Sequence, residues 1–91
     1  MREIVLYTKP GCHLCAETRL TLDALLVERR LAGLDAPAVD ERDITLDPAW
    51  ERAYFAEVPV VAVGHRELAL ATSPSRLRRF LDEALTAAVA S

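Results

Sequence analysis

The sequence predicts an α/β domain in which a four-stranded mixed sheet carries helices on both faces. Three features support this fold class: a strand-helix-strand unit at the start, two strands joined by a two-residue turn near the end, and an amphipathic final helix. Parallel strands need a helical crossover between them, whereas a two-residue turn joins antiparallel strands. The expected order is βαβαββα, and we assign residues 1–91 to a single domain because a chain of 91 residues has room for one core.

The first strand is expected at residues 4–7, an apolar run that ends at the turn-forming residues 9–11. A long helix should begin at or near Cys12 and stop at Gly33, because glycine is the preferred residue just past a helix end. Its buried face is predicted from residues at helical spacing, namely Leu14, Thr18, Leu22, Leu25 and Leu26.

The middle of the chain predicts an edge strand and a short helix. Residues 37–44 carry a weaker strand signal, and their charged stretch 40–43 suits an edge position. Asp47 and Pro48 should open the helix, since aspartate is a preferred cap and proline fits the first helical position. The aromatic residues on this helix are interpreted as packing residues, namely Trp50, Tyr54 and Phe55.

The last third predicts a hairpin and a final helix. Residues 58–63 give the strongest strand signal, and Gly64-His65 should form a tight turn into a strand at 67–71. Ser73 and Pro74 repeat the pattern of a cap followed by proline. The apolar face of the final helix is predicted from Leu77, Phe80, Leu81, Ala84, Leu85 and Ala88.

Composition excludes several classes of partner. Hydrophobic residues make up 52% of the chain, charged residues make up 27%, and the net charge is −3. This balance is typical of a globular protein, and the scattered charges offer no footprint for nucleic acid or for a membrane surface. Neither a secretory signal nor a run of roughly 20 apolar residues is found. We therefore expect a cytoplasmic protein, and we separately expect it to be a monomer.

Both cysteines lie in one motif, Cys12-His13-Leu14-Cys15. In a cytoplasmic protein such a pair is more often redox-active, catalytic or metal-binding than structural. A bond between them closes a very short loop, so it stabilises the fold only weakly. The motif therefore indicates chemistry at the sulfur atoms.

The position of Cys12 favours its thiolate. A free cysteine has a pKa near ~8.5 and is mostly protonated at neutral pH. At the first turn of a helix, unpaired amides and the helix dipole stabilise a negative sulfur, and Lys9 and protonated His13 would add positive charge. Cys15 lies one turn deeper and should be shielded. We therefore predict that Cys12 attacks a substrate disulfide and that Cys15 resolves the mixed disulfide.

Residues 7–15 and the pair Val58-Pro59 resemble motifs of the glutaredoxin and thioredoxin superfamily. The resemblance covers nearly the whole chain, is closer to glutaredoxins in length, and includes a bacterial glutaredoxin-like family with a Cys-His-Leu-Cys type motif. It implies a thioredoxin-like fold of glutaredoxin size and a thiol-disulfide oxidoreductase.

The resemblance also implies roles for individual residues. Pro59 should be a cis proline facing the cysteines, and the backbone of Val58 should pair with the substrate chain. Lys9 matches a lysine that contacts glutathione in glutaredoxins. The partners implied are a disulfide-containing protein or a small thiol substrate, with electrons from glutathione or from a donor of the thioredoxin-reductase type. Glutathione is thus a candidate co-substrate, and no bound cofactor is expected.

The sequence departs from glutaredoxins before the final helix. Their glutathione-binding Gly-Gly pair is absent, and residues 71–75 read Ala-Thr-Ser-Pro-Ser. The hydroxyls of Thr72 and Ser73, with nearby helix amides, are the remaining candidates for holding a carboxylate, although Pro74 removes one donor.

Two other functions stay open: a non-catalytic binding module with this fold, and a metal or iron-sulfur carrier. In the second, Cys12 and glutathione would hold a cluster between two copies. We expect no zinc site, because closed zinc sites take four ligands and only His13 and His65 could add to the cysteines. His13 and Lys9 also fit as ordinary surface residues, and Pro59 as a trans proline.

Overall fold

The elements of the chain follow the predicted order, with one short addition. The computed structural model describes residues 3–90, and the side chains of residues 3–86. The elements are β1 (Ile4–Thr8), α1 (His13–Leu31), β2 (Val39–Asp43), the 3-10 turn η1 (Ile44–Leu46), α2 (Pro48–Tyr54), β3 (Val60–Val63), β4 (Arg66–Leu68) and α3 (Pro74–Ala90).

The four strands form one mixed sheet in the order β2-β1-β3-β4. β1 pairs in parallel with β2 and antiparallel with β3, and β3 pairs antiparallel with β4. The charged strand β2 therefore lies at an edge, as predicted from its sequence. The mixed sheet and the order βαβαββα confirm the predicted α/β fold of thioredoxin-like topology.

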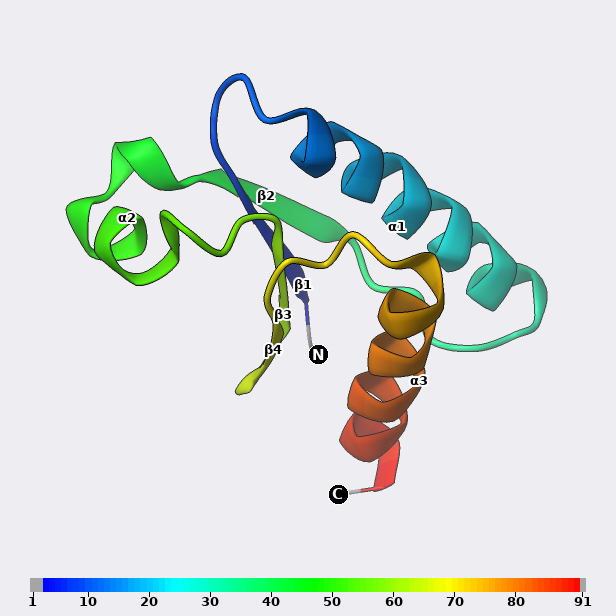
Figure 1. Cartoon of the computed structure of the whole chain (residues 1–91). Coiled ribbons are helices and arrows are strands. Elements are labelled where there is room, and N and C mark those ends of the chain that lie inside the picture. The colour runs from blue at the N-terminus through cyan, green and yellow to red at the C-terminus, as the bar shows by residue number, and fades with distance from the viewer. Residues whose placement is uncertain (1–2, 91) are drawn as a thin grey trace.

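The two faces of the sheet carry different helices. In β1, Ile4 and Leu6 pack on the side of α1 and α3, whereas Val5 and Tyr7 pack on the side of α2. Figure 1 shows α1 and α3 on one side of the strands and α2 on the other. Every residue of the two central strands β1 and β3 is buried, because both of their faces are covered.

Both ends of α1 are fixed by local geometry. The helix starts immediately after Cys12, which is its N-cap residue with φ −93° and ψ 102°. At the other end Gly33 has φ +76°, and the amides of Gly33 and Leu34 donate to the carbonyls of Arg30 (3.1 Å) and Arg29 (2.8 Å). These two bonds form a Schellman motif, so Gly33 stops the helix as predicted.

The predicted buried face of α1 is wrong at one residue. Leu14 is 50% exposed, whereas the other predicted members of that face are buried. Cys15 takes the inward position of the first turn and is 3% exposed. Leu14 therefore turns toward solvent beside the cysteine pair.

The hairpin is present but its second strand is shorter than predicted. Gly64-His65 joins β3 to β4 as a two-residue turn. The prediction of a strand through residues 67–71 is wrong beyond β4. Leu70 has φ +49°, and the amide of Thr72 donates to its carbonyl at 2.7 Å. This tight turn takes the chain out of the sheet.

Side-chain caps begin α2 and α3, and proline is the first residue of each helix. The Asp47 carboxylate accepts the Ala49 amide at 2.8 Å, and the Ser73 hydroxyl accepts the Arg76 amide at 3.3 Å. Ala88, the last member of the predicted face of α3, lies outside the described side chains. Within residues 3–90, no helix combines the length and apolar character needed to cross a membrane.

Candidate functional site

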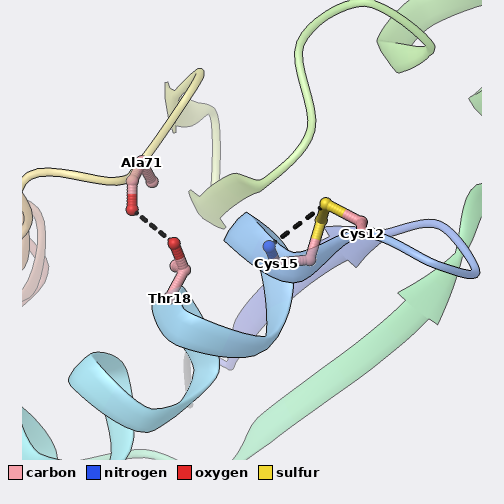
Figure 2. The surroundings of a disulfide bond; sticks show 4 residues. All are labelled: Cys12, Cys15, Thr18 and Ala71. Atoms are coloured by element: carbon pink, nitrogen blue, oxygen red, sulfur yellow. Dashed lines mark hydrogen bonds between the residues drawn. A yellow bond between two sulfur atoms is a disulfide. The ribbon is translucent and has the colours of Figure 1, made fainter.

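Cys12 and Cys15 meet at the start of α1, where they form a disulfide bond (Figure 2). Their Cα atoms lie 5.2 Å apart, within the usual range for bonded cysteines. The two sulfurs predicted to react with each other are therefore within bonding reach.

The Cys12 sulfur takes the place of an N-cap oxygen. Its Sγ accepts a hydrogen bond from the Cys15 amide at 3.1 Å, and the Cys12 carbonyl accepts the Ala16 amide at 3.2 Å. The first turn of α1 contains no acidic residue. An amide donor and the positive end of a helix dipole both stabilise negative charge on a sulfur in this position.

The two cysteines differ in accessibility. Cys12 is partly exposed, whereas Cys15 is 3% exposed and belongs to the core cluster on the α2 side of the sheet. The Cys12 side chain is therefore accessible from solvent, whereas Cys15 is shielded by the protein.

Lys9 lies beside the cysteine pair. It lines one shallow groove together with Cys12, Cys15, Arg19, Leu20 and Glu41. Lys9 is exposed, and its charge therefore borders the path to the Cys12 sulfur. Positively and negatively charged side chains both line the groove, and Arg19 donates a hydrogen bond to Glu41 at 3.1 Å.

His13 and His65 are both exposed and lie apart in the fold, His13 at the start of α1 and His65 in the turn before β4. In the part of the chain that the structure describes, no three histidine, cysteine, aspartate or glutamate residues are grouped so that they could hold a metal ion.

Val58 and Pro59 immediately precede β3, and the peptide bond between them is cis, as the resemblance implied. Val58 is buried in the cluster that contains Cys15 and against which Cys12 packs. The Val58 amide donates to the Tyr54 carbonyl at 3.2 Å, so this donor is already engaged within the chain. Pairing with a substrate through that amide would require the intrachain bond to open.

A pair of hydrogen bonds connects α1 with Pro59, and sequence reasoning missed it. The Thr18 hydroxyl, one turn after Cys15, donates to the Ala71 carbonyl at 2.8 Å (Figure 2). The Ala71 amide in turn donates to the Pro59 carbonyl at 2.8 Å. The one signal in the sequence was a threonine among leucines on the buried face of the helix.

Thr72 and Ser73 lie immediately before α3, where part of their hydrogen-bonding capacity is already used. The Thr72 amide donates to the Leu70 carbonyl, and the Ser73 hydroxyl caps α3 and lies 3.3 Å from the Ser75 hydroxyl. Leu70, rather than a glycine, holds the left-handed conformation in this segment.

Aromatic side chains hold α2 against the sheet next to the site. The Tyr54 ring stacks on Tyr7 with 4.2 Å between centroids, and Trp50 meets Tyr7 edge-on at 6.0 Å. The Tyr54 hydroxyl donates to Glu67 in β4 at 2.5 Å, and this bond raises the pKa of Tyr54 above that of a free tyrosine. Trp50 and Tyr54 thus pack as predicted, whereas Phe55 is exposed.

Comparisons with known proteins agree with the fold and the motif. The sequence profile of the glutaredoxin-like domain (DUF836) matches residues 3–88. A similar solved structure is the X-ray structure of the Northeast Structural Genomics target protein XcR50 from X. campestris. It has 34% sequence identity and a TM-score of 0.70, and the match covers 89% of this chain and 97% of that one. No curated protein matches the chain. On the extent of the profile match and this identity, the chain belongs to the glutaredoxin-like (DUF836) family.

Proposed function

We propose that the protein is a dithiol-disulfide oxidoreductase in which Cys12 is the attacking cysteine and Cys15 the resolving cysteine. One observation carries the proposal: the partly exposed Cys12 sulfur accepts an amide hydrogen bond at the start of α1, with the buried Cys15 sulfur within bonding reach. Thiolate stabilisation, access and a nearby second thiol are what a dithiol exchange cycle requires.

In the first step the Cys12 thiolate attacks one sulfur of a substrate disulfide. A bond forms between Cys12 and that sulfur, the substrate disulfide breaks, and the departing sulfur leaves as a thiolate that takes up a proton. The amide of Cys15 and the start of α1 stabilise the attacking thiolate before this step.

In the second step the Cys15 thiol loses its proton and attacks the Cys12 sulfur of the mixed disulfide. The remaining substrate sulfur is released and protonated, and Cys12 is bonded to Cys15. The substrate has gained two electrons and the protein has lost two. A donor must then return them, for which we propose glutathione or a reductase of the thioredoxin-reductase type.

The substrate is a disulfide of a protein or of a small thiol, bound across the groove beside Cys12. Lys9 would attract an anionic group of that substrate, and His13 would add charge when protonated. The Val58 carbonyl, the Thr72 hydroxyl and the Ser73 hydroxyl are further candidate contacts. Because the Val58 amide donates to Tyr54, we expect substrate pairing at Val58 to be weaker than with a free amide.

The pH dependence of Cys12 alkylation tests this proposal. The Cys15→Ser variant leaves Cys12 as the only thiol, and we expect its alkylation to follow an apparent pKa well below the ~8.5 of a free cysteine. The Cys12→Ser variant, in which Cys15 is the only thiol, should react slowly. An apparent Cys12 pKa close to that of free cysteine would instead favour the non-catalytic binding module.

The same variants separate the two steps. Cys12→Ser should abolish disulfide reduction, whereas Cys15→Ser should still form a mixed disulfide, which mass spectrometry detects. Turnover of the oxidised protein by glutathione with its reductase, compared with thioredoxin reductase, identifies the donor. A visible absorbance band in anaerobically purified protein would point instead to the iron-sulfur carrier.

A further inference from the structure

One side of α1 carries apolar side chains that face solvent. We call it the outer stripe, and its members are Leu20, Ala24, Val27 and Leu31. Leu20 is 72% exposed, Val27 47% and Leu31 83%, and Ala24 is also exposed. Leu34, just past the helix end, is exposed as well but lies on the α3 side of α1, where it lines a pocket with Arg29 and Leu81. Apolar side chains lined up in this way on a surface helix usually mark an interaction surface.

The outer stripe has the spacing of a helix-pairing seam. Its members alternate steps of four and three residues, which is the heptad spacing with which two helices pack side by side. At 100° per residue the stripe lies about 180° around the helix from the buried residues. In Figure 1 no other element covers the side of α1 that faces away from the sheet.

We propose that the outer stripe is the interface of a homodimer in which α1 packs antiparallel against α1 of a second copy. A two-fold axis between Ala24 and Val27 places Leu20 opposite Leu31 of the second copy and Ala24 opposite Val27. Each leucine then packs against a leucine of the second copy, and each alanine packs against a valine. This proposal departs from the monomer expected from the sequence.

The charges beside the outer stripe favour a second copy in this orientation. Asp23 already accepts a hydrogen bond from Arg19 Nε at 3.0 Å within the chain. In the antiparallel arrangement it also faces Arg30 of the second copy, and the symmetry repeats this pair on the other side. Both residues are exposed. In a parallel arrangement Asp23 would face Glu28 of the second copy, which places like charges together. Since Arg78 already donates to Glu28 within the chain, the attraction between Asp23 and Arg30 is what favours the antiparallel dimer.

The dimer would border the groove beside Cys12. Leu20 belongs both to the outer stripe and to the lining of that groove. In the antiparallel register the end of α1 in the second copy, with Leu31, lies next to Leu20. The second copy would thus form part of the surface that a substrate meets as it approaches the cysteine pair.

Sedimentation velocity of the reduced full chain, from low micromolar to millimolar concentration, tests the dimer. We expect a reversible monomer-dimer equilibrium. Leu31→Glu should abolish it without unfolding the protein, because Leu31 is exposed. Asp23→Arg and Arg30→Asp should each weaken association, on the order of tenfold, since each turns two attractive pairs into repulsive ones. The double variant D23R/R30D should restore association by reversing both charges.

Controls and opposite outcomes are built into the same series. Arg79→Asp makes the same charge change as Arg30→Asp, but at an exposed position of α3 away from the outer stripe. It should leave association unchanged. Circular dichroism checks that each variant is folded. A chain that stays monomeric throughout would overturn the proposal. Stronger association in Asp23→Arg would overturn it too, because the introduced arginine would face Glu28 only in the parallel arrangement.

Discussion

Thr18 shows how a single polar side chain can have a role that its neighbours in sequence do not reveal. It is 2% exposed on a helix face whose other buried residues, apart from Arg29, are apolar. A buried hydroxyl without a partner would destabilise the fold, so its bond to Ala71 explains why threonine is tolerated there. The bond also fixes the segment that donates to Pro59, next to the cysteine pair.

Replacing Thr18 by valine keeps the shape of the side chain but leaves the Ala71 carbonyl without its donor. We expect Thr18→Val to lower the free energy of unfolding by about 1–3 kcal/mol, measured by urea denaturation. Thr18→Ser, which keeps the hydroxyl, should recover much of the loss. Thr21→Val, on the same helix but less buried, serves as the matched control. Equal effects at both positions would argue against the Ala71 bond as the cause.

At the scale of an element, α2 depends on contacts at its ends and on two aromatic side chains rather than on a buried face. None of its residues is fully buried. Instead it is held by the Asp47 cap, by stacking of Tyr54 on Tyr7 and by the hydrogen bond from Tyr54 to Glu67. The last turn of this helix supplies the carbonyl that accepts the Val58 amide, so the position of α2 bears directly on the backbone beside the cysteines.

The bond to Glu67 gives α2 a pH-dependent contribution to stability. Because the folded state raises the pKa of Tyr54 above its ordinary value of 10.0, the contribution is complete below pH 10 and is lost as the pH rises further. The difference in unfolding free energy between the native chain and Tyr54→Phe should therefore shrink above pH 10. Urea denaturation of both proteins at several pH values measures this difference. The titration of all other groups affects both proteins alike and therefore cancels in the comparison.

Glu67→Ala provides the control for this pH effect. It removes the acceptor, so replacing Tyr54 by phenylalanine in that background should give a stability difference with much less pH dependence. A difference that stays constant across alkaline pH in the native background would show that the Glu67 bond does not hold the Tyr54 proton.

At the scale of the whole molecule, Arg29 joins segments that are far apart in the sequence. Its Nε donates to the Asp35 carbonyl at 2.6 Å after the end of α1, and its Nη1 contacts Asp82 of α3 at 2.7 Å. Arg29 is buried, whereas Asp82 is largely exposed. The arginine thus fixes the end of α1 to α3 on the side of the sheet that both helices cover.

Arg29→Met should preserve most of the packing of the arginine stem while removing both hydrogen bonds. We expect a loss of about 1–3 kcal/mol in the free energy of unfolding, because the Asp35 carbonyl loses its donor and α3 loses an anchor. Chemical denaturation in dilute solution measures the loss. The neighbouring Arg30→Met is the control, since an exposed arginine should change stability by less than about 0.5 kcal/mol.

Local signals in the sequence were sufficient for the order of the elements. Gly33, Asp47 and the turn at Gly64-His65 act through bonds to residues a few positions away, so their effects follow from the sequence near them. The cysteine motif is equally local, and its place at the start of a helix was predictable for the same reason.

The tertiary structure alone decided the features that depend on distant residues. Burial of Cys15 with exposure of Leu14, the engagement of the Val58 amide by Tyr54, and the bond from Thr18 to Ala71 all depend on how the helices lie against the sheet. Sequence periodicity shows which residues share a helix face, but it does not specify which carbonyl or side chain from elsewhere in the chain that face will meet. For this protein, the sequence determined the order of the main elements and the place of the cysteine pair at the start of a helix, and packing between elements determined which groups surround the sulfur atoms.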